Sequence, residues 1–160
     1  MTTPVPGLDS EEDLLWRSLV EVLVRLPRVL DEHFTREAKV GMSEYSVLVA
    51  LSEAPEGELR MGELAEATAL SRSRMSRVVD DLVRKSLVTR RKSEQDGRSA
   101  LAAVTPEGLA VLAAVYPEHL ARVRSLILDH VTKSEMRAMT QALSRILLAL
   151  RATTDSDQAE

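Results

Sequence analysis

The side chains best suited to binding a ligand lie between Ser71 and Arg98 of the 160-residue chain. The start of this stretch combines arginines with small hydroxyl side chains: Ser71, Arg72, Ser73, Arg74, Ser76 and Arg77. Guanidinium and hydroxyl groups donate hydrogen bonds both to phosphate oxygens and to the base edges of DNA. The stretch is therefore a candidate DNA-binding surface. The residue types leave open which arginines contact bases and which contact phosphates.

These side chains need a helix to present them together. Four apolar residues recur among them at steps of three and four, which predicts one buried face: Met75, Val78, Val79 and Leu82. Ser71 has a hydroxyl that can cap a helix by accepting a backbone N–H. The sequence therefore predicts a capped helix with a polar outer face.

A basic hairpin is expected directly after this helix. Residues 87–92 look extended and basic, residues 93–97 predict a turn, and residues 99–104 predict the returning strand. The returning segment is rich in alanine and would suit a helix by propensity, but the glycine before it and Thr105-Pro106 after it favour a strand. A helix with a polar front followed by such a hairpin indicates a recognition helix with a wing.

Positive charge is concentrated in the same stretch. The chain as a whole has a net charge of −4, from 21 lysines and arginines against 25 acidic residues. Residues 71–98 hold nine basic and four acidic residues, a local net charge of +5 that leaves −9 for the rest. A basic patch on an acidic protein is typical of a surface that docks on DNA, and we assign Arg90 and Lys92 to it. A charged helix and hairpin also occur as ordinary solvated surface.

Helical periodicity precedes this stretch. Residues 10–39 carry a long apolar stripe, in which Ser10 and Asp13 are expected to form a capping box and Pro27 to kink the helix. Gly41 is expected to end it. The stripe is longer than one small domain usually buries, so we expect part of it to face a second subunit.

Two short helices are expected next, over residues 44–52 with Ser43 as N-cap and over residues 61–68, separated by a turn at 55–57. A short helix, a brief turn and a capped polar-fronted helix form a helix-turn-helix pattern.

Two longer helices are expected after the hairpin. Thr105 and Pro106 are an N-cap and a first helical residue, opening a helix to about residue 130. Thr132 and Glu135 predict a second capping box, opening a last helix to about residue 152.

The composition excludes several classes. The chain has no cysteine, which excludes disulfides, thiolate metal sites and thiol redox switches. No apolar run approaches the roughly 18 residues of a membrane span, and the N-terminus lacks the pattern of a signal peptide. We expect a cytoplasmic protein that does not bind membranes.

Over residues 10–150 the chain resembles the MarR (multiple antibiotic resistance regulator) family of transcription factors. The resemblance is most specific over residues 59–108, in LSRSRMSRVVDDL at 70–82, the Asp96-Gly97-Arg98 tip and TPEG at 105–108. Ser86 replaces the glycine usual at the end of the recognition helix, so it must adopt a left-handed conformation or close the helix differently. Gly62 also departs from the pattern, since Ser or Thr commonly caps there.

The resemblance implies a mainly α fold with a small β-wing and about six helices. Residues 43–104 would form the winged helix-turn-helix domain that binds DNA. Residues 10–40 and 105–152 would form a helical dimerisation region, with short polar tails at 1–9 and 153–160.

The resemblance also implies a homodimer whose recognition helices enter the major grooves of double-stranded DNA at an inverted repeat. Arg98 would reach the adjacent minor groove, whose negative potential is strongest where it is narrow and rich in A·T pairs. Asp96 would hold the wing tip through a charge-assisted contact. We expect a dimeric repressor of a palindromic operator.

Family members often release DNA when a small aromatic or phenolic effector binds. Five residues on or beside the first two helices are candidates to line such a site: Trp16, His33, Phe34, Met42 and Tyr45. Taken one at a time, these residues are better explained by ordinary core packing with a surface histidine, since a pocket uses few convergent polar groups.

Two other function classes are possible for such a chain. An enzyme or metal site would depend on the clusters at residues 31–33, 118–119 and 129–130, none of which has a partner at metal-ligand spacing or a glycine-rich phosphate loop. We therefore expect no enzyme activity, no metal and no cofactor. A winged helix used only for contact with other proteins is the stronger alternative, although a protein interface usually depletes charge at its centre.

Overall fold

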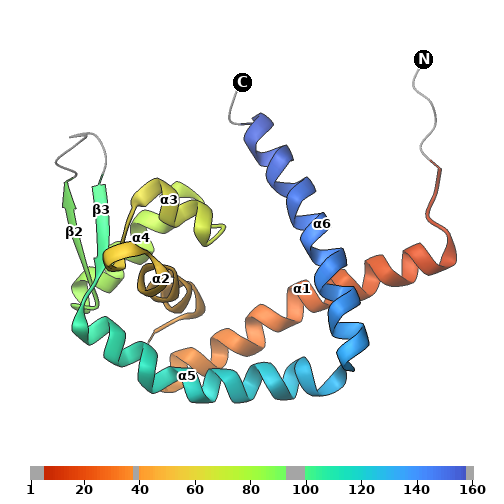
Figure 1. The fold of residues 1–160 in the computed structure, drawn as a ribbon, viewed down its shortest axis with the longest axis horizontal. Helices are drawn as coiled ribbons and strands as arrows, with labels where there is room; N and C mark the ends of the chain where they lie inside the picture. The colour runs from red at the N-terminus through yellow and green to blue at the C-terminus, as the bar shows by residue number, and fades with distance from the viewer. Residues whose placement is uncertain (1–5, 38–39, 93–99, 158–160) are drawn as a thin grey trace. The chain divides into compact units, whose positions relative to one another are not determined.

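The computed structural model describes residues 6–37, 40–92 and 100–157, with side chains outside the description at 32–37 and 154–157. Six α-helices and three strands are present within these residues, together with two short 3-10 helices. In chain order the elements are α1 (Ser10–Glu37), α2 (Met42–Glu53), η1 (Pro55–Gly57), β1 (Glu58–Arg60), α3 (Met61–Ala67), α4 (Arg72–Arg84), β2 (Val88–Lys92), β3 (Ala100–Val104), α5 (Pro106–Leu126), η2 (Leu128–His130) and α6 (Lys133–Asp157). Figure 1 shows this order. The mainly α fold with a small β-wing is confirmed.

The best-packed core lies among α2, α3, α4 and the strands, which contact one another pairwise. Its buried residues include Val47, Leu48 and Leu51 from α2 and Leu64 from α3. All four apolar residues predicted for α4 are buried. The core therefore fixes which faces of α3 and α4 remain exposed.

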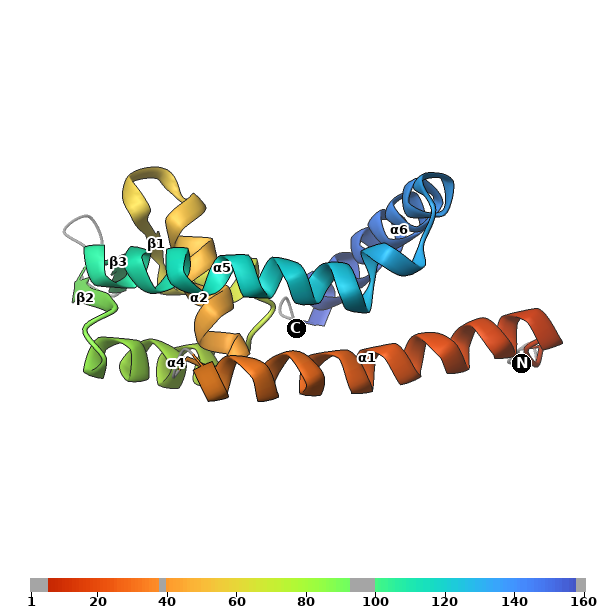
Figure 2. The same ribbon diagram turned by 90° about the horizontal axis from the view of Figure 1, so that it is seen from below.

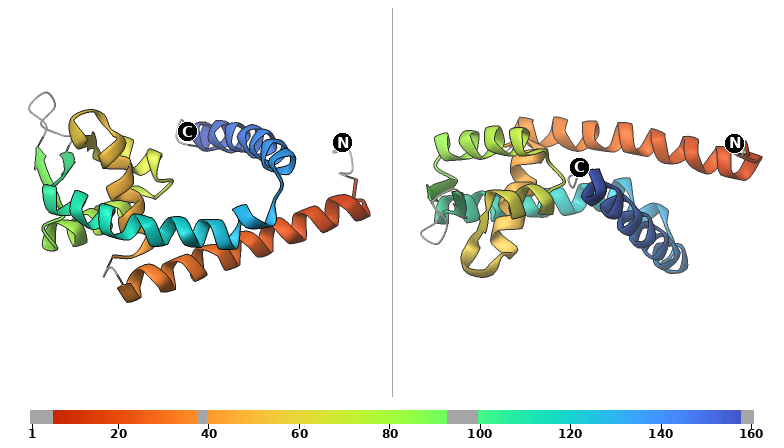
Figure 3. Two further views of the ribbon diagram at one scale, coloured as in Figure 1. Left: turned by 60° about the horizontal axis from the view of Figure 1, so that its bottom comes forward. Right: turned by 90° about the horizontal axis from the view of Figure 1, so that it is seen from above.

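The sheet has three antiparallel strands in the order β1-β3-β2. The hairpin strands β2 and β3 pair with Val88 opposite Val104 and Lys92 opposite Ala100. Figure 3 shows β2 and β3 side by side, with α5 following β3. The alanine-rich returning segment is thus a strand, as its flanking residues predicted. The sequence did not predict β1, which is only three residues long and pairs with β3 across a long stretch of chain, with Glu58 opposite Ala103 and Arg60 opposite Leu101.

Two helices end with a left-handed residue that is not glycine. After α4, Ser86 has φ +61°, its N–H donates to Val83, and the N–H of Leu87 donates to Leu82 at 2.9 Å. After α3, Ala69 has φ +53° and the same hydrogen-bond pattern. Both ends are Schellman motifs, where glycine is the usual residue. Of the two closures considered for Ser86, the left-handed one is present.

Two predicted helix starts were wrong. The capping box of α1 consists of Asp9 and Glu12, one residue earlier than predicted: Asp9 Oδ1 accepts from two backbone N–H groups and Glu12 Oε2 accepts from the N–H of Asp9. Asp13 instead pairs with Arg17. The N-cap of α2 is Gly41, not Ser43.

Two other predicted starts are confirmed. Thr105 Oγ1 accepts from the N–H of Gly108 at 3.0 Å, so Thr105 caps α5 with Pro106 as its first residue. Thr132 and Glu135 form the reciprocal box that opens α6, with Thr132 N–H donating to Glu135 Oε2 at 2.8 Å. The helix ends differ from those predicted, because α5 stops at Leu126 before η2 and α6 continues to Asp157.

The chain divides into two compact units after Tyr116. Within the first unit, α2 lies next to the C-terminal part of α1 (Figure 2). The Oδ1 atom of Asp31 on α1 accepts a hydrogen bond from the N–H of Met42 at 2.8 Å. None of the helices in the described ranges is long and apolar enough to cross a membrane.

Many large apolar side chains of α1 and α6 are exposed. On α1 they include Leu14, Leu15, Trp16, Val22 and Leu23; on α6 they include Met139, Leu143, Ile146, Leu147, Leu148 and Leu150. The apolar stripe predicted for the first helix is therefore largely exposed on α1, although Leu30 near its C-terminal part is buried, and α6 carries a second exposed row of apolar residues.

Candidate nucleic-acid interface

The first turn of α4 is capped as predicted. Ser71 Oγ accepts from the N–H of Arg74 at 3.4 Å and lies 3.3 Å from the hydroxyl of Ser73. Ser71, Arg72, Ser73, Arg74 and Arg77 are exposed, and Ser76 is half-buried. The structure therefore presents this predicted set at and near one end of the helix.

The geometry of α4 separates the polar residues into different faces. At 3.6 residues per turn, Ser73, Arg77 and Arg84 lie on the face opposite the buried Met75 and Leu82. These three side chains and the exposed Asp80 point away from the core and form the outermost ridge of the helix. Among the predicted arginines, Arg77 is therefore the one at the centre of the exposed face.

Arg74 belongs to a neighbouring face that is directed towards α2. Its Nη2 atom donates to Ser43 Oγ at 3.0 Å, across 31 residues of sequence. Arg74 is therefore engaged with α2, whereas Arg77 lies on the outer face of α4. Nothing in the sequence distinguishes these two arginines.

Arg90 links the wing to the recognition helix. Its Nη1 atom lies 2.9 Å from Asp80 Oδ1 and 3.5 Å from Ser76 Oγ, both on α4. The ion pair is partly exposed, with 37% and 50% of the Arg90 and Asp80 side chains accessible. Asp80 was absent from the predicted set because an acid inside a basic stretch gives no local signal of its partner.

The other cations of β2 have different surroundings. Side chains alternate along a strand, so Lys92 lies on the same side as Arg90 and Arg91 lies on the other. Arg91 donates to both carboxylate oxygens of Glu58 on β1, at 2.9 and 3.0 Å. Lys92 is exposed at the end of β2. Asp96 and Arg98 lie outside the described residues.

Another ion pair that the sequence did not predict joins the end of α4 to α2. Lys85 Nζ lies 2.7 and 2.8 Å from the two carboxylate oxygens of Glu44. The partners are 41 residues apart, so no sequence spacing indicates the pair.

The candidate effector residues do not all gather within one chain. Tyr45 is buried in the core and Met42 packs against it, whereas Trp16 is exposed on α1. Trp16 lies 15 residues before Asp31, which is about 22 Å along the helix axis. It lines an open hollow whose other residues also belong to α1. The side chains of His33 and Phe34 lie outside the description.

Burial raises the pKa of the Tyr45 phenol above its ordinary value, and the nearby Tyr116 and Glu53 add to this effect. The phenol of Tyr45 is therefore neutral near pH 7 and serves as an uncharged polar group within an apolar core. In the described part of the chain, no three His, Asp or Glu side chains are close enough together to hold a metal ion.

Residues 40–99 match the family model described as the MarR family. No curated protein sequence matches the chain. Among solved structures, the chain is similar to AbsC, a MarR family transcriptional regulator from Streptomyces coelicolor, with 32% identity and a TM-score of 0.86, covering 92% of this chain and 99% of that one.

Two further structures from the same organism are similar. Sco3205, a MarR family transcriptional regulator solved in complex with DNA, has 32% identity and a TM-score of 0.88, with 93% of both chains covered. The PcaV transcriptional regulator, solved in complex with its natural ligand, has 25% identity and a TM-score of 0.68, covering 91% of this chain and 99% of that one. The capped, arginine-bearing helix α4, its attached wing and these matches over nearly the full chain show that the protein belongs to the MarR family of transcriptional regulators.

Proposed function

We propose that the protein is a dimeric transcriptional repressor that binds an inverted repeat in double-stranded DNA. The observation that carries this proposal is the joined surface of α4 and β2, in which the Arg90–Asp80 pair holds a basic strand beside an exposed ridge of arginine and serine. The DNA complex of Sco3205 supports the same use of the fold. Repression is the commoner habit of the family.

Within this surface the residues take different roles. Ser73 and Arg77 enter the major groove, because they lie on the outermost ridge of α4. Ser71, Arg72, Arg74 and Ser76 flank the ridge at positions suited to phosphate contacts. Lys92, on the wing strand β2, contacts the phosphate backbone of the DNA. Arg98 enters the minor groove, with Asp96 holding the wing tip.

A second copy of the chain is the proposed partner of the exposed apolar residues on α1 and α6. Leu15 on α1 and Leu148 on α6 are 70% and 68% accessible, and both belong to longer apolar stripes. An exposed apolar stripe along a helix marks an interface between proteins. Residues 10–40 and 105–152 are the proposed dimerisation region, and residues 43–104 the DNA-binding domain. Measurement of the molecular mass in solution tests the dimer, and a mass twice that of the chain is the expected result.

A small phenolic or aromatic effector is the proposed release signal, supported by the PcaV structure with its natural ligand. Of the candidate contacts, Met42 and Tyr45 lie near each other at the start of α2, where Tyr45 belongs to the core and Met42 packs against that core. Added phenolic acids should lower DNA affinity in proportion to their occupancy. An unmoved thermal unfolding curve across a broad panel of such acids would remove this part of the proposal.

Selection of the purified protein on random-sequence duplex DNA at near-physiological salt tests the proposal. Enrichment of an A/T-bearing palindrome, with half-sites about one helical turn apart, is the expected result for a twofold dimer. A well-folded dimer that enriches no sequence would favour the alternative, a winged-helix module that contacts other proteins.

A further inference from the structure

The first turn of α2 meets the recognition helix α4 at two places. Arg74, in the first turn of α4, donates to Ser43, and Lys85, the C-cap of α4, pairs with Glu44. Arg74 and Lys85 are three helical turns apart on one face, about 16 Å along the axis. They therefore reach the same turn of α2 from opposite ends of the recognition helix.

Glu44 is the central group of this turn. Its Oε2 atom accepts from the N–H of Gly41 at 2.8 Å, which closes the start of α2, and both of its oxygens accept from Lys85. Only 12% of the Glu44 side chain is accessible, against 39% for Lys85. The carboxylate is therefore held in place by a hydrogen bond at the start of its own helix, and it pairs with Lys85 at the end of α4 from that position.

The same turn is attached to α1. Asp31 Oδ1 accepts from the N–H of Met42, the residue between Gly41 and Ser43. A Cβ added at Gly41 would lie 3.4 Å from that same oxygen, so the end of α1 and the start of α2 are closely packed. The turn at residues 41–44 thus connects three helices through short polar contacts.

We propose that Glu44 is a positioning residue for DNA binding, acting through Lys85 to set the placement of α4. This inference rests on the proposed DNA-binding function and deepens it, because it assigns a role to an acidic residue that touches no DNA. Lys85 then acts as a tether within the protein and not as a phosphate contact. The wing is joined to α4 by a different ion pair, between Arg90 and Asp80.

Electrostatics alone predicts the opposite sign for Glu44. Removing an acidic charge near a DNA-binding surface strengthens attraction to phosphates. Loss of a positioning contact weakens binding instead, because α4 no longer rests at the placement that fits the groove. The direction of the change therefore separates the two explanations.

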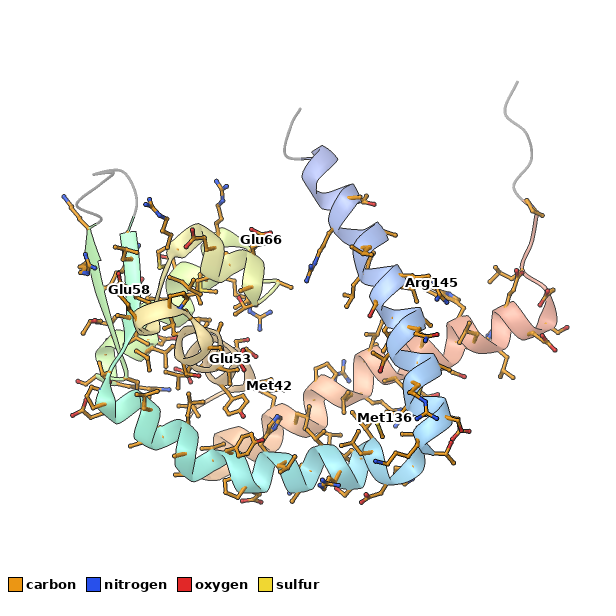
Figure 4. All side chains as sticks on the ribbon, in the orientation of Figure 1. Met42, Glu53, Glu58, Glu66, Met136 and Arg145 are labelled. Atoms are coloured by element: carbon orange, nitrogen blue, oxygen red, sulfur yellow. The ribbon has the colours of Figure 1, made fainter. Side chains whose placement is uncertain are left out.

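Glu44→Gln is the main variant. The amide oxygen of Gln still accepts from the N–H of Gly41, since Gln also serves at this position of a capping box, but the charge that holds Lys85 is gone. Glu53→Gln is the matched control, because Glu53 is an exposed residue at the other end of α2; Figure 4 labels it together with Met42 at the helix start. Lys85→Gln and the double variant complete a cycle. The full-length protein and its selected palindromic duplex are used, with affinity measured across a salt series and thermal unfolding recorded for each variant.

The expected result is that Glu44→Gln and Lys85→Gln each weaken binding about five- to tenfold, the range of a coupling between directly contacting residues. The double variant, which has the net charge of the wild type, should be no weaker than Lys85→Gln alone. Glu53→Gln should bind as well as the wild type or better.

Each of the following outcomes would overturn the inference. Tighter binding by Glu44→Gln, or wild-type affinity of the double variant, would show that only charge matters. If Lys85→Gln reduces the slope of log K against log salt by about 0.9, Lys85 contacts a phosphate. This measurement can be made even if Glu44→Gln does not fold. If the folded wild-type protein binds no duplex, both the proposed function and this inference are wrong. If the wild-type protein binds and Glu44→Gln binds equally well, only the inference is wrong.

Discussion

Arg90 on β2 and Asp80 on α4 form an ion pair with 2.9 Å between Nη1 and Oδ1, and this pair joins the wing to the recognition helix. The two residues are ten apart in sequence and lie on either side of the left-handed turn at Ser86. The pair therefore joins the wing and α4 into one surface, the one proposed to bind DNA.

Replacement of Asp80 by Asn should weaken DNA binding although it removes an acidic charge, because the wing loses its attachment to α4. The effect on folding stability should be small, about 0–1 kcal/mol, since the pair is partly exposed. Asp81→Asn is the matched control: it removes the same charge one residue away, where the carboxylate pairs with Arg84. Fluorescence anisotropy with a labelled operator duplex measures both. Equal tightening in the two variants would show that Asp80 acts only as a charge.

Lys92→Ala should lower affinity moderately for every duplex and flatten its salt dependence. A lysine that neutralises one phosphate contributes about 0.9 to the slope of log K against log salt. Arg91→Ala is the comparison, because Arg91 lies on the other side of β2 and pairs with Glu58. Binding titrations at several salt concentrations give the slopes. An unchanged slope in Lys92→Ala would remove Lys92 from the interface.

Gly108→Ala should destabilise the fold by about 1–3 kcal/mol, the usual penalty for overpacking. A Cβ at residue 108 would lie 2.3 Å from the carbonyl oxygen of Leu87 and 2.9 Å from a methyl of Val104, so the backbone would have to move. Gly62→Ala is the control, because nothing lies within 4 Å of its Cβ position in α3. That change should stabilise the helix by about 0.5–1 kcal/mol. Chemical denaturation of both variants measures the difference, and similar values for the two would contradict the close approach at Gly108.

Ser86→Gly should stabilise the protein by about 0.5–1 kcal/mol, because glycine adopts the left-handed conformation at φ +61° without steric penalty. Ser52→Gly, inside the last turn of α2, should have the opposite sign. Thermal unfolding of the two variants and the wild type checks the prediction. A lower unfolding midpoint for Ser86→Gly would mean that the serine side chain stabilises the folded protein by more than the left-handed backbone destabilises it.

The pKa of Glu135 should lie below the ordinary glutamate value, because its carboxylate accepts hydrogen bonds from the side chain and then the backbone of Thr132. A lowered pKa in the folded state stabilises α6 at pH values above the unfolded pKa, and this contribution is lost as the pH falls through the folded value. Thr132→Ala should return the pKa towards normal, whereas Thr132→Ser should largely preserve it. Carbon-detected NMR titration of the carboxyl group measures all three, and an equal pKa in wild type and Thr132→Ala would exclude the capping box as the cause.

Much of the fold was predictable because its signals are local. The apolar spacing of Met75, Val78, Val79 and Leu82 determined the buried face of α4, and Thr105-Pro106 determined the start of α5. Both depend only on residues within one or two helical turns. The start of α1 was misplaced by one residue, because Asp9–Glu12 and Ser10–Asp13 offer similar capping pairs and the sequence contains no measure of which pair closes.

Within the candidate site, the sequence by itself determined which residues are polar and basic, and that a helix and a hairpin carry them. Only the tertiary structure decided which way the arginines point: Arg77 outwards, Arg74 to Ser43, Arg90 to Asp80 and Arg91 to Glu58. The three-residue strand β1 and the pair of Lys85 with Glu44 were decided in the same way. Contacts between residues 10 to 45 positions apart depend on how separate helices and strands pack, and no periodicity along the chain encodes that packing.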